Sequence, residues 1–144
     1  IYIDINRQTS DKTRILELIE NAKTDLNSNK NDSAITKIKT ILEESFKIIL
    51  KKEEIDFSKS DSIGELFKKV RNLERIKHSN CEEYIKKLFS GISQQIQAIS
   101  ELRNDIGDAH GHGCTKTQIS NEDTRLFLNI SISLADYFFS IIKN

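Results

Sequence analysis

Apolar residues recur along most of the chain at the three- and four-residue intervals of an amphipathic helix. One pattern occupies residues 11–27, and a second follows in residues 34–49 after a polar run, 27–32, that is typical of a turn. The two patterns consist of Ile15, Ile19, Ala22 and Leu26, and of Ile35, Ile38, Leu42, Ser45 and Ile49. Because helices joined by a short turn pack antiparallel along such seams, these patterns predict a helical hairpin.

Two further patterns predict a short helix and a long one. Residues 53–60 form a connector, in which Ile55 and Phe57 are expected to anchor the chain and after which Ser60 or Asp61 is expected to cap a helix. The inward side of this short helix is formed by Ile63, Leu66, Phe67, Val70 and Leu73. Beyond Asn80, the long helix has a stripe that consists of Ile85, Leu88, Ile92, Ile96, Ile99, Leu102 and Ile106.

The last helix is expected to begin at Ser120 or Asn121, to end near Lys143, and to be apolar on two faces. One face consists of Phe127, Ile130, Leu134, Phe138 and Ile141, and the other of Leu128, Ile132, Ala135, Phe139 and Ile142. The two faces lie about 100° apart around the helix. Such a helix is central in its bundle or shared with a second subunit, so we predict a homodimer through the faces near the last two helices.

Glycine is concentrated between the long helix and the last one. Gly107 is expected to end the long helix, because glycine readily adopts the left-handed conformation that closes helices. Residues 107–118 contain three of the five glycines and two of the three histidines. The predicted fold is therefore all-α, a five-helix bundle with an extended glycine-rich loop before the last helix.

The composition supports one helical domain over residues 1–144. Proline is absent and only 5 residues are glycine, which favours long helices. Apolar residues make up 37% of the chain and charged residues 31%, a balance typical of folded domains. The chain begins at Ile1 and contains no methionine, so we expect it to be the C-terminal part of a longer protein with a further N-terminal domain.

The charge balance narrows the classes of partner. With 22 basic and 22 acidic residues, the chain has no excess of positive charge for coating duplex DNA. A local basic run at 68–77 is interpreted as a solvated helix face or as a surface that guides RNA. No uninterrupted apolar run reaches the roughly 20 residues of a membrane span, and Cys81 and Cys114 are isolated, so we expect a cytoplasmic protein without membrane contact.

The densest group of reactive side chains surrounds the end of the long helix. Arg103 follows Ile99 by four residues, which places it about 40° from a core position, at the rim of the apolar stripe. His110 is expected to fold back toward this last turn once Gly107 has turned the chain. An arginine that is always charged and a histidine that titrates near neutrality form a suitable pair for phosphodiester chemistry.

RNA supplies its own nucleophile in the ribose 2′-OH, so a protein need only move protons and stabilise charge. His110 is suited to act as general base or acid, and Arg103 to hold the phosphate through two parallel hydrogen bonds. Asn104 can orient either group, because its amide both donates and accepts hydrogen bonds.

The segment from Leu102 to Gly111 resembles the HEPN superfamily, which carries an Arg-x(4–6)-His motif at a helix end. More narrowly, it resembles the C-terminal domain of abortive-infection phage-defence proteins, whose pattern Leu-Arg-Asn-x-x-Gly-x-x-His-Gly is met in full. This resemblance implies a homodimer with two Arg–His pairs facing one cleft. It also implies a toxin-like antiviral effector that cleaves RNA without metal and leaves a 2′,3′-cyclic phosphate.

These considerations assign catalysis to Arg103, Asn104 and His110. Binding of the RNA substrate is assigned to Gly107, Gly111 and His112, of which His112 lies outside the family pattern. No cofactor and no metal are expected.

Three alternatives remain beside this assignment. Arg103 and Asn104 are also suited to close the C-terminal turn of a helix. The potential ligands Asp108, His110, His112 and Cys114 could hold zinc or copper, although their spacing matches no established metal motif. The whole chain could instead be a non-catalytic HEPN-like module that dimerises or binds nucleotides and regulates the N-terminal domain.

Overall fold

The computed structural model describes residues 10–77, 82–112 and 118–142, with the side chains of residues 12–77, 83–106 and 118–142. These ranges contain six helices and no strand, so the predicted all-α class is confirmed. The helices are α1 (Ser10–Asn27), α2 (Asn31–Lys52), α3 (Ile63–Arg71), α4 (Glu74–Lys77), α5 (Glu82–His112) and α6 (Asn121–Ile142). The count exceeds the predicted five because the single turn α4 stands apart from α3.

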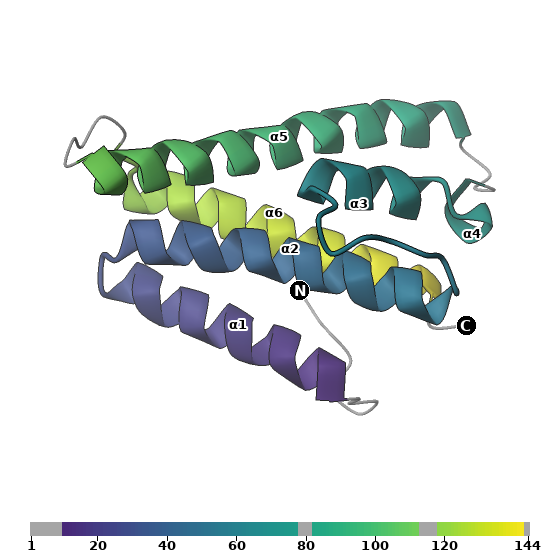
Figure 1. The fold of residues 1–144 in the computed structure, drawn as a ribbon, viewed down its shortest axis with the longest axis horizontal. Helices are drawn as coiled ribbons and strands as arrows, with labels where there is room; N and C mark the ends of the chain where they lie inside the picture. The colour runs from purple at the N-terminus through teal and green to yellow at the C-terminus, as the bar shows by residue number, and fades with distance from the viewer. Residues whose placement is uncertain (1–9, 78–81, 113–117, 143–144) are drawn as a thin grey trace.

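Helix α2 is the centre of the bundle and packs against α1, α3, α5 and α6. Figure 1 shows the long helices running along the longest axis of the molecule, with α1 and α5 on opposite sides of α2. The C-terminal end of α5 lies at the same end of the bundle as the first turns of α2 and α6 (Figure 1). That end of the molecule holds the Arg103 segment.

The predicted hairpin of α1 and α2 is confirmed. All nine residues of its two apolar seams are buried. The turn uses Asn29 in the left-handed region, at φ 58°, which asparagine tolerates better than most residues. Lys37 on α2 forms an ion pair with Asp25 on α1. Burial alone would raise the pKa of Asp25, but hydrogen bonds from Lys37 and Ser33 outweigh it and leave this pKa lowered.

An aromatic cluster joins four helices in the core. Phe138 of α6 lies 6.0 Å from Phe46 of α2, 6.1 Å from Phe67 of α3 and 6.1 Å from Phe89 of α5, between ring centroids. Phe46 and Phe67 are themselves 5.6 Å apart. Because Phe138 touches rings from three other helices, it sets how α6 sits against the rest of the bundle.

Of the two apolar faces expected on α6, one is buried completely and the other only in part. The face with Leu128 is the buried one, whereas Phe127, Ile130 and Ile141 of the other face are half-buried. The chain thus covers more of α6 than predicted and leaves less surface for a second subunit. α6 is also long and apolar enough to cross a membrane by length and composition, a test that buried core helices pass as well.

The connector and the caps differ from prediction at single residues. Phe57 packs against the core as predicted, but Ile55 is 41% exposed and is not part of the packed core. Ser62, rather than Ser60 or Asp61, caps α3 by accepting a hydrogen bond from the Glu65 backbone N–H at 3.2 Å. The Asp61 carboxylate is engaged elsewhere, by Lys69 at 2.7 Å.

The buried stripe of α5 is displaced at its beginning. Leu88 was predicted to face inward but is 54% exposed, whereas its neighbour Phe89 is buried. The cause is the aromatic cluster: Phe89 reaches Phe67 at 6.2 Å, which turns this part of α5 so that Leu88 faces outward. The rest of the stripe is buried or half-buried as predicted.

The prediction that Gly107 ends the long helix is wrong, because α5 continues through it to His112. Glycine costs a helix interior only about 1 kcal/mol relative to alanine. Packing of the turn before it, where Ile106 is buried, favours continuation. The glycine-rich loop was expected to span residues 107–118. The first half of this segment, residues 107–112, is helical, and residues 113–117 lie outside the described ranges.

Candidate functional site

Arg103 lies where the hydrophobic pattern predicted it, at the edge of the buried face of α5. Its side chain is half-buried, while Ile99, one turn before it, and Ile106, three residues after it, are buried. Asn104, the next residue, is exposed. Because neighbouring residues of a helix point about 100° apart, Arg103 lies against the edge of the core while Asn104 faces solvent.

The guanidinium of Arg103 has no carboxylate partner among the described side chains. The nearest acidic neighbours in sequence, Glu101 and Asp105, are exposed. The Oε1 atom of Glu101 instead accepts a hydrogen bond from Nε2 of Gln97 at 2.9 Å. A half-buried arginine without an ion pair leaves its charge and its N–H groups available to an anion.

The expected reversal of the chain at Gly107 does not occur, and the motif is arranged along one helix instead. Positions 103 and 110 are two turns apart, about 10.5 Å along the axis and about 20° around it. Gly107 lies about one turn after position 103 on this face, whereas Gly111 lies about 100° around the helix from position 110. The side chains of residues 107–112 are outside the description, so the placement of His110 and His112 rests on the backbone alone.

The end of the bundle that holds this motif also holds two helix N-termini. The Nδ2 atom of Asn31, in the first turn of α2, donates a hydrogen bond to the carbonyl of Ile119, just before α6, at 3.2 Å. Helix N-termini carry partial positive charge and unpaired backbone N–H groups. The first turns also carry Asp32 on α2 and Glu122 and Asp123 on α6, whose negative charges offset this partial positive charge.

An open hollow of about 460 Å³ lies between these two N-termini, lined by residues 29–33, Gln118 and Ile119. The Oδ1 atoms of Asn31 and Asn121 are buried near it without a hydrogen-bond partner among the described residues. Sequence reasoning missed this hollow, because it read residues 27–32 only as a turn. The polar side chains of that turn were the available signal.

The basic run of residues 68–77 is not one uniform surface. Lys69 bonds the carboxylate of Asp61, and Arg75 lies 3.5 Å from the carboxylate of Glu53 and donates to the carbonyl of Ile142. The hydrogen bond from Lys69 holds the pKa of Asp61 below its usual value. These two cations stabilise the bundle itself, which leaves Lys68, Arg71 and Lys77 as candidates to meet a ligand.

The zinc or copper alternative concerns residues whose side chains are not described. Asp108, His110 and His112 lie in the last turns of α5, and Cys114 lies beyond them. Among the side chains that the structure does describe, no three histidine, cysteine, aspartate or glutamate residues gather into a metal site.

The Abi_C family model, described as a HEPN-like domain, matches residues 13–141. The chain belongs to this family. The match covers nearly all of the described bundle, from the first turns of α1 to the end of α6, and includes the Arg103–His110 segment. No curated protein and no solved structure matches this Abi_C domain.

Proposed function

We propose that this Abi_C domain is a metal-independent endoribonuclease that acts as a toxin-like effector in abortive-infection defence against phage. The observation that carries the proposal is Arg103, half-buried and without an ion-pair partner among the described side chains. It lies on the helix face that also includes position 110, with a glycine between the two. A phosphate can approach the helix at Gly107, because no side chain stands there.

In the proposed reaction, the ribose 2′-oxygen attacks the adjacent phosphorus, and the bond from phosphorus to the 5′-oxygen breaks. His110 accepts the 2′-hydroxyl proton as base while water donates a proton to the departing 5′-oxygen, or it donates that proton as acid while water accepts the 2′-hydroxyl proton. Arg103 stabilises the negative charge that grows on the phosphoryl oxygens, and Asn104 orients the reacting groups. Gly107 and Gly111 admit the RNA backbone, and His112 contacts it beyond the reacting phosphate.

We expect chelation to leave cleavage intact, since the proposed chemistry uses only side chains. The purified domain is incubated with total RNA in excess EDTA, with His110→Ala as the matched control for contaminating nucleases. Fragments should form at the same rate with and without EDTA, and only with the wild-type chain.

Two results would contradict this expectation. Stoichiometric zinc that is lost together with activity on chelation would assign residues 108–114 to a metal site. No fragments under any condition, from a folded protein, would favour the non-catalytic module that regulates an N-terminal domain.

We also expect the domain to form a homodimer, which would bring two Arg–His pairs to one cleft. Apolar side chains remain on the surface of the two helices concerned: Leu126 is 59% exposed near the start of α6, at the end of the bundle where α5 finishes, and Tyr84 and Leu88 are 74% and 54% exposed at the opposite end of α5. Light scattering at tens of micromolar should give twice the 16.6 kDa of the chain. A monomer at that concentration would argue against the shared cleft.

A further inference from the structure

A second candidate binding site lies between α3, α4 and the first turns of α5. It is a hollow of about 300 Å³, at the small end of the range for ligand pockets. The lining residues are Arg71, Asn72, Ile76, Lys77, Ile85, Lys86 and Phe89. Three of them are cations from three different helices, and none of them carries a carboxylate.

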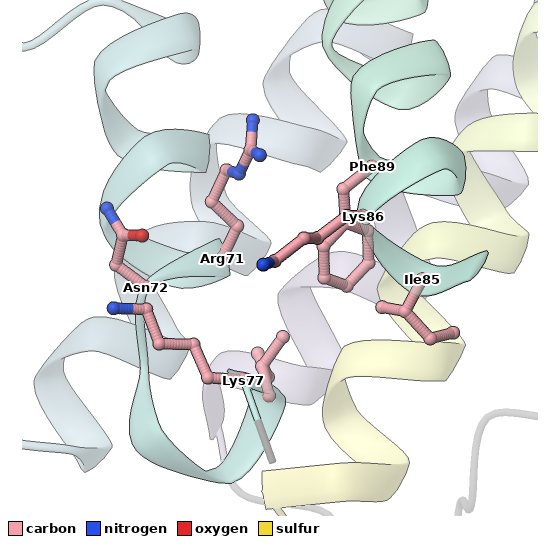
Figure 2. A pocket seen from close by; sticks show the side chains of 7 residues that line it. Arg71, Asn72, Lys77, Ile85, Lys86 and Phe89 are labelled. Carbon is pink, nitrogen blue, oxygen red and sulfur yellow. The ribbon is translucent and has the colours of Figure 1, made fainter. Parts of the chain in front are cut away.

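The cations lie beside an apolar floor. Figure 2 shows Lys86 extending from α5 toward Arg71 on α3, with the ring of Phe89 beside it, and Lys77 extending toward Asn72. Ile76 and Phe89 are buried, and Ile85 is half-buried. The guanidinium of Arg71 donates to Oγ of Ser93 at 3.4 Å, which holds it at the wall on the α5 side. Such a site suits a ligand with an anionic part and a flat apolar part, and its amide at Asn72 can reach a base edge.

The face of α5 that begins at Lys86 reaches Asn104, which lies about 100° around the helix from the neighbouring Arg103. Lys86 and Asn104 are 18 residues apart, five full turns, so they lie on one face about 27 Å apart along the axis. Between them this face presents Ser93 and Gln97, which are polar and uncharged. Glu101 stands at its edge, with its carboxylate hydrogen-bonded to Gln97.

We propose that this hollow binds one nucleotide of a single-stranded RNA. The phosphate of this nucleotide lies near the three cations, and its base lies against the apolar floor. The strand then follows the Lys86–Asn104 face of α5 to the cleavage site. The assignment to RNA rests on the proposed function, whereas the binding site itself does not. A free nucleotide offers the same chemistry, but the continuous polar face between hollow and motif favours a strand.

The test is binding of a fluorescent 12-nucleotide 2′-O-methyl RNA, which lacks the free 2′-hydroxyl and cannot be cleaved by the proposed mechanism. The double variant Lys77→Glu/Lys86→Glu is compared with Lys59→Glu/Lys87→Glu, which has the same charge change at exposed lysines outside the hollow. Anisotropy should show at least about tenfold weaker binding for the first variant and less than about twofold for the second. The dependence of log affinity on log salt should become shallower by about one for the first variant.

Competition separates the sources of the ligand. Adenosine monophosphate that displaces the oligonucleotide at a similar concentration would assign the hollow to a free nucleotide and overturn the RNA assignment. Inorganic phosphate that displaces it equally well would reduce the site to anion binding. Equal loss of affinity in the two double variants would overturn the site altogether.

Cleavage assays keep this proposal distinct from the catalytic one. Lys77→Glu/Lys86→Glu should cleave a ribodinucleotide, which is too short to reach the hollow, at the wild-type rate, while its cleavage of long RNA falls. Arg103→Ala should still bind the 2′-O-methyl RNA, and this binding should still weaken when Lys77 and Lys86 are replaced. The same binding is expected if the wild-type chain does not cleave RNA.

Discussion

Arg103→Ala and His110→Ala are each expected to lower the rate of RNA cleavage about 10²–10³-fold. This loss corresponds to about 3–4 kcal/mol, the usual effect of removing one positioned electrostatic or acid–base group. The melting temperature should change little for Arg103→Ala, because this side chain is only half-buried and has no ion pair among the described residues. Rates and melting curves measured on the same preparations separate the two effects.

Several variants sharpen this experiment. Arg103→Lys keeps the charge but loses the two parallel N–H donors, so its rate should fall between those of the wild type and Arg103→Ala. Asn104→Ala should lose less activity, and His112→Ala less again. Arg125→Ala, which removes an exposed arginine from α6, is the matched control and should retain full activity.

Two further observations test the mechanism itself. The double variant of Arg103 and His110 should be little slower than either single variant, because groups that act together on one phosphate are not additive. The wild-type fragments should end in a 2′,3′-cyclic phosphate, since the 2′-oxygen is the nucleophile. Full activity in His110→Ala, or fragments ending in a 3′-hydroxyl, would defeat the proposal.

The sequence predicted the helices well where one strong apolar period decided the structure. The hairpin of α1 and α2 is an example, because each seam must be buried and a single polar run separates them. The position of Arg103 at the rim of the buried face of α5 follows from the same reasoning. A residue four positions after the buried Ile99 lies about 40° around the helix from it, whatever its neighbours are.

Prediction from the sequence was less accurate where tertiary contacts compete with local signals. Leu88 and Phe89 are both apolar and adjacent, and the pattern alone does not determine which one faces inward. Phe89 is the buried one, because it packs against the rings of Phe67 on α3 and Phe138 on α6. Likewise Gly107 predicts the end of a helix, yet α5 continues through it, and the buried Ile106 just before it favours this continuation. The interpretation of the motif changes accordingly, from a loop folded back on Arg103 to residues along one helix, of which positions 103, 107 and 110 share a face.

The cationic hollow could not be predicted from the basic run that supplies part of it. Lys69 and Arg75 belong to the same run as Arg71 and Lys77, but ion pairs with Asp61 and Glu53 direct them elsewhere. Only the meeting of α3, α4 and α5 shows which cations face a common space, and this meeting also brings in Lys86 from outside the run.

Phe138→Ala is expected to destabilise the bundle by about 3–5 kcal/mol, the usual range for truncating a buried phenylalanine. Phe138 has no exposed surface and contacts rings on α2, α3 and α5, so its removal leaves a cavity at the junction of four helices. Because single domains are stable by only about 5–15 kcal/mol, this loss is a large share of the total.

Urea denaturation measures this effect as a lower midpoint with an unchanged slope, provided that the variant unfolds in one step. Phe127→Ala is the matched control on the same helix: its ring is only half-buried, so less apolar surface is lost and its neighbours can close the gap. Phe138→Leu should recover most of the stability, because a branched aliphatic side chain fills much of the cavity. If Phe138→Ala were no more destabilising than Phe127→Ala, the aromatic cluster would not be the point at which α6 is held, and the arrangement of helices around Phe138 would be wrong.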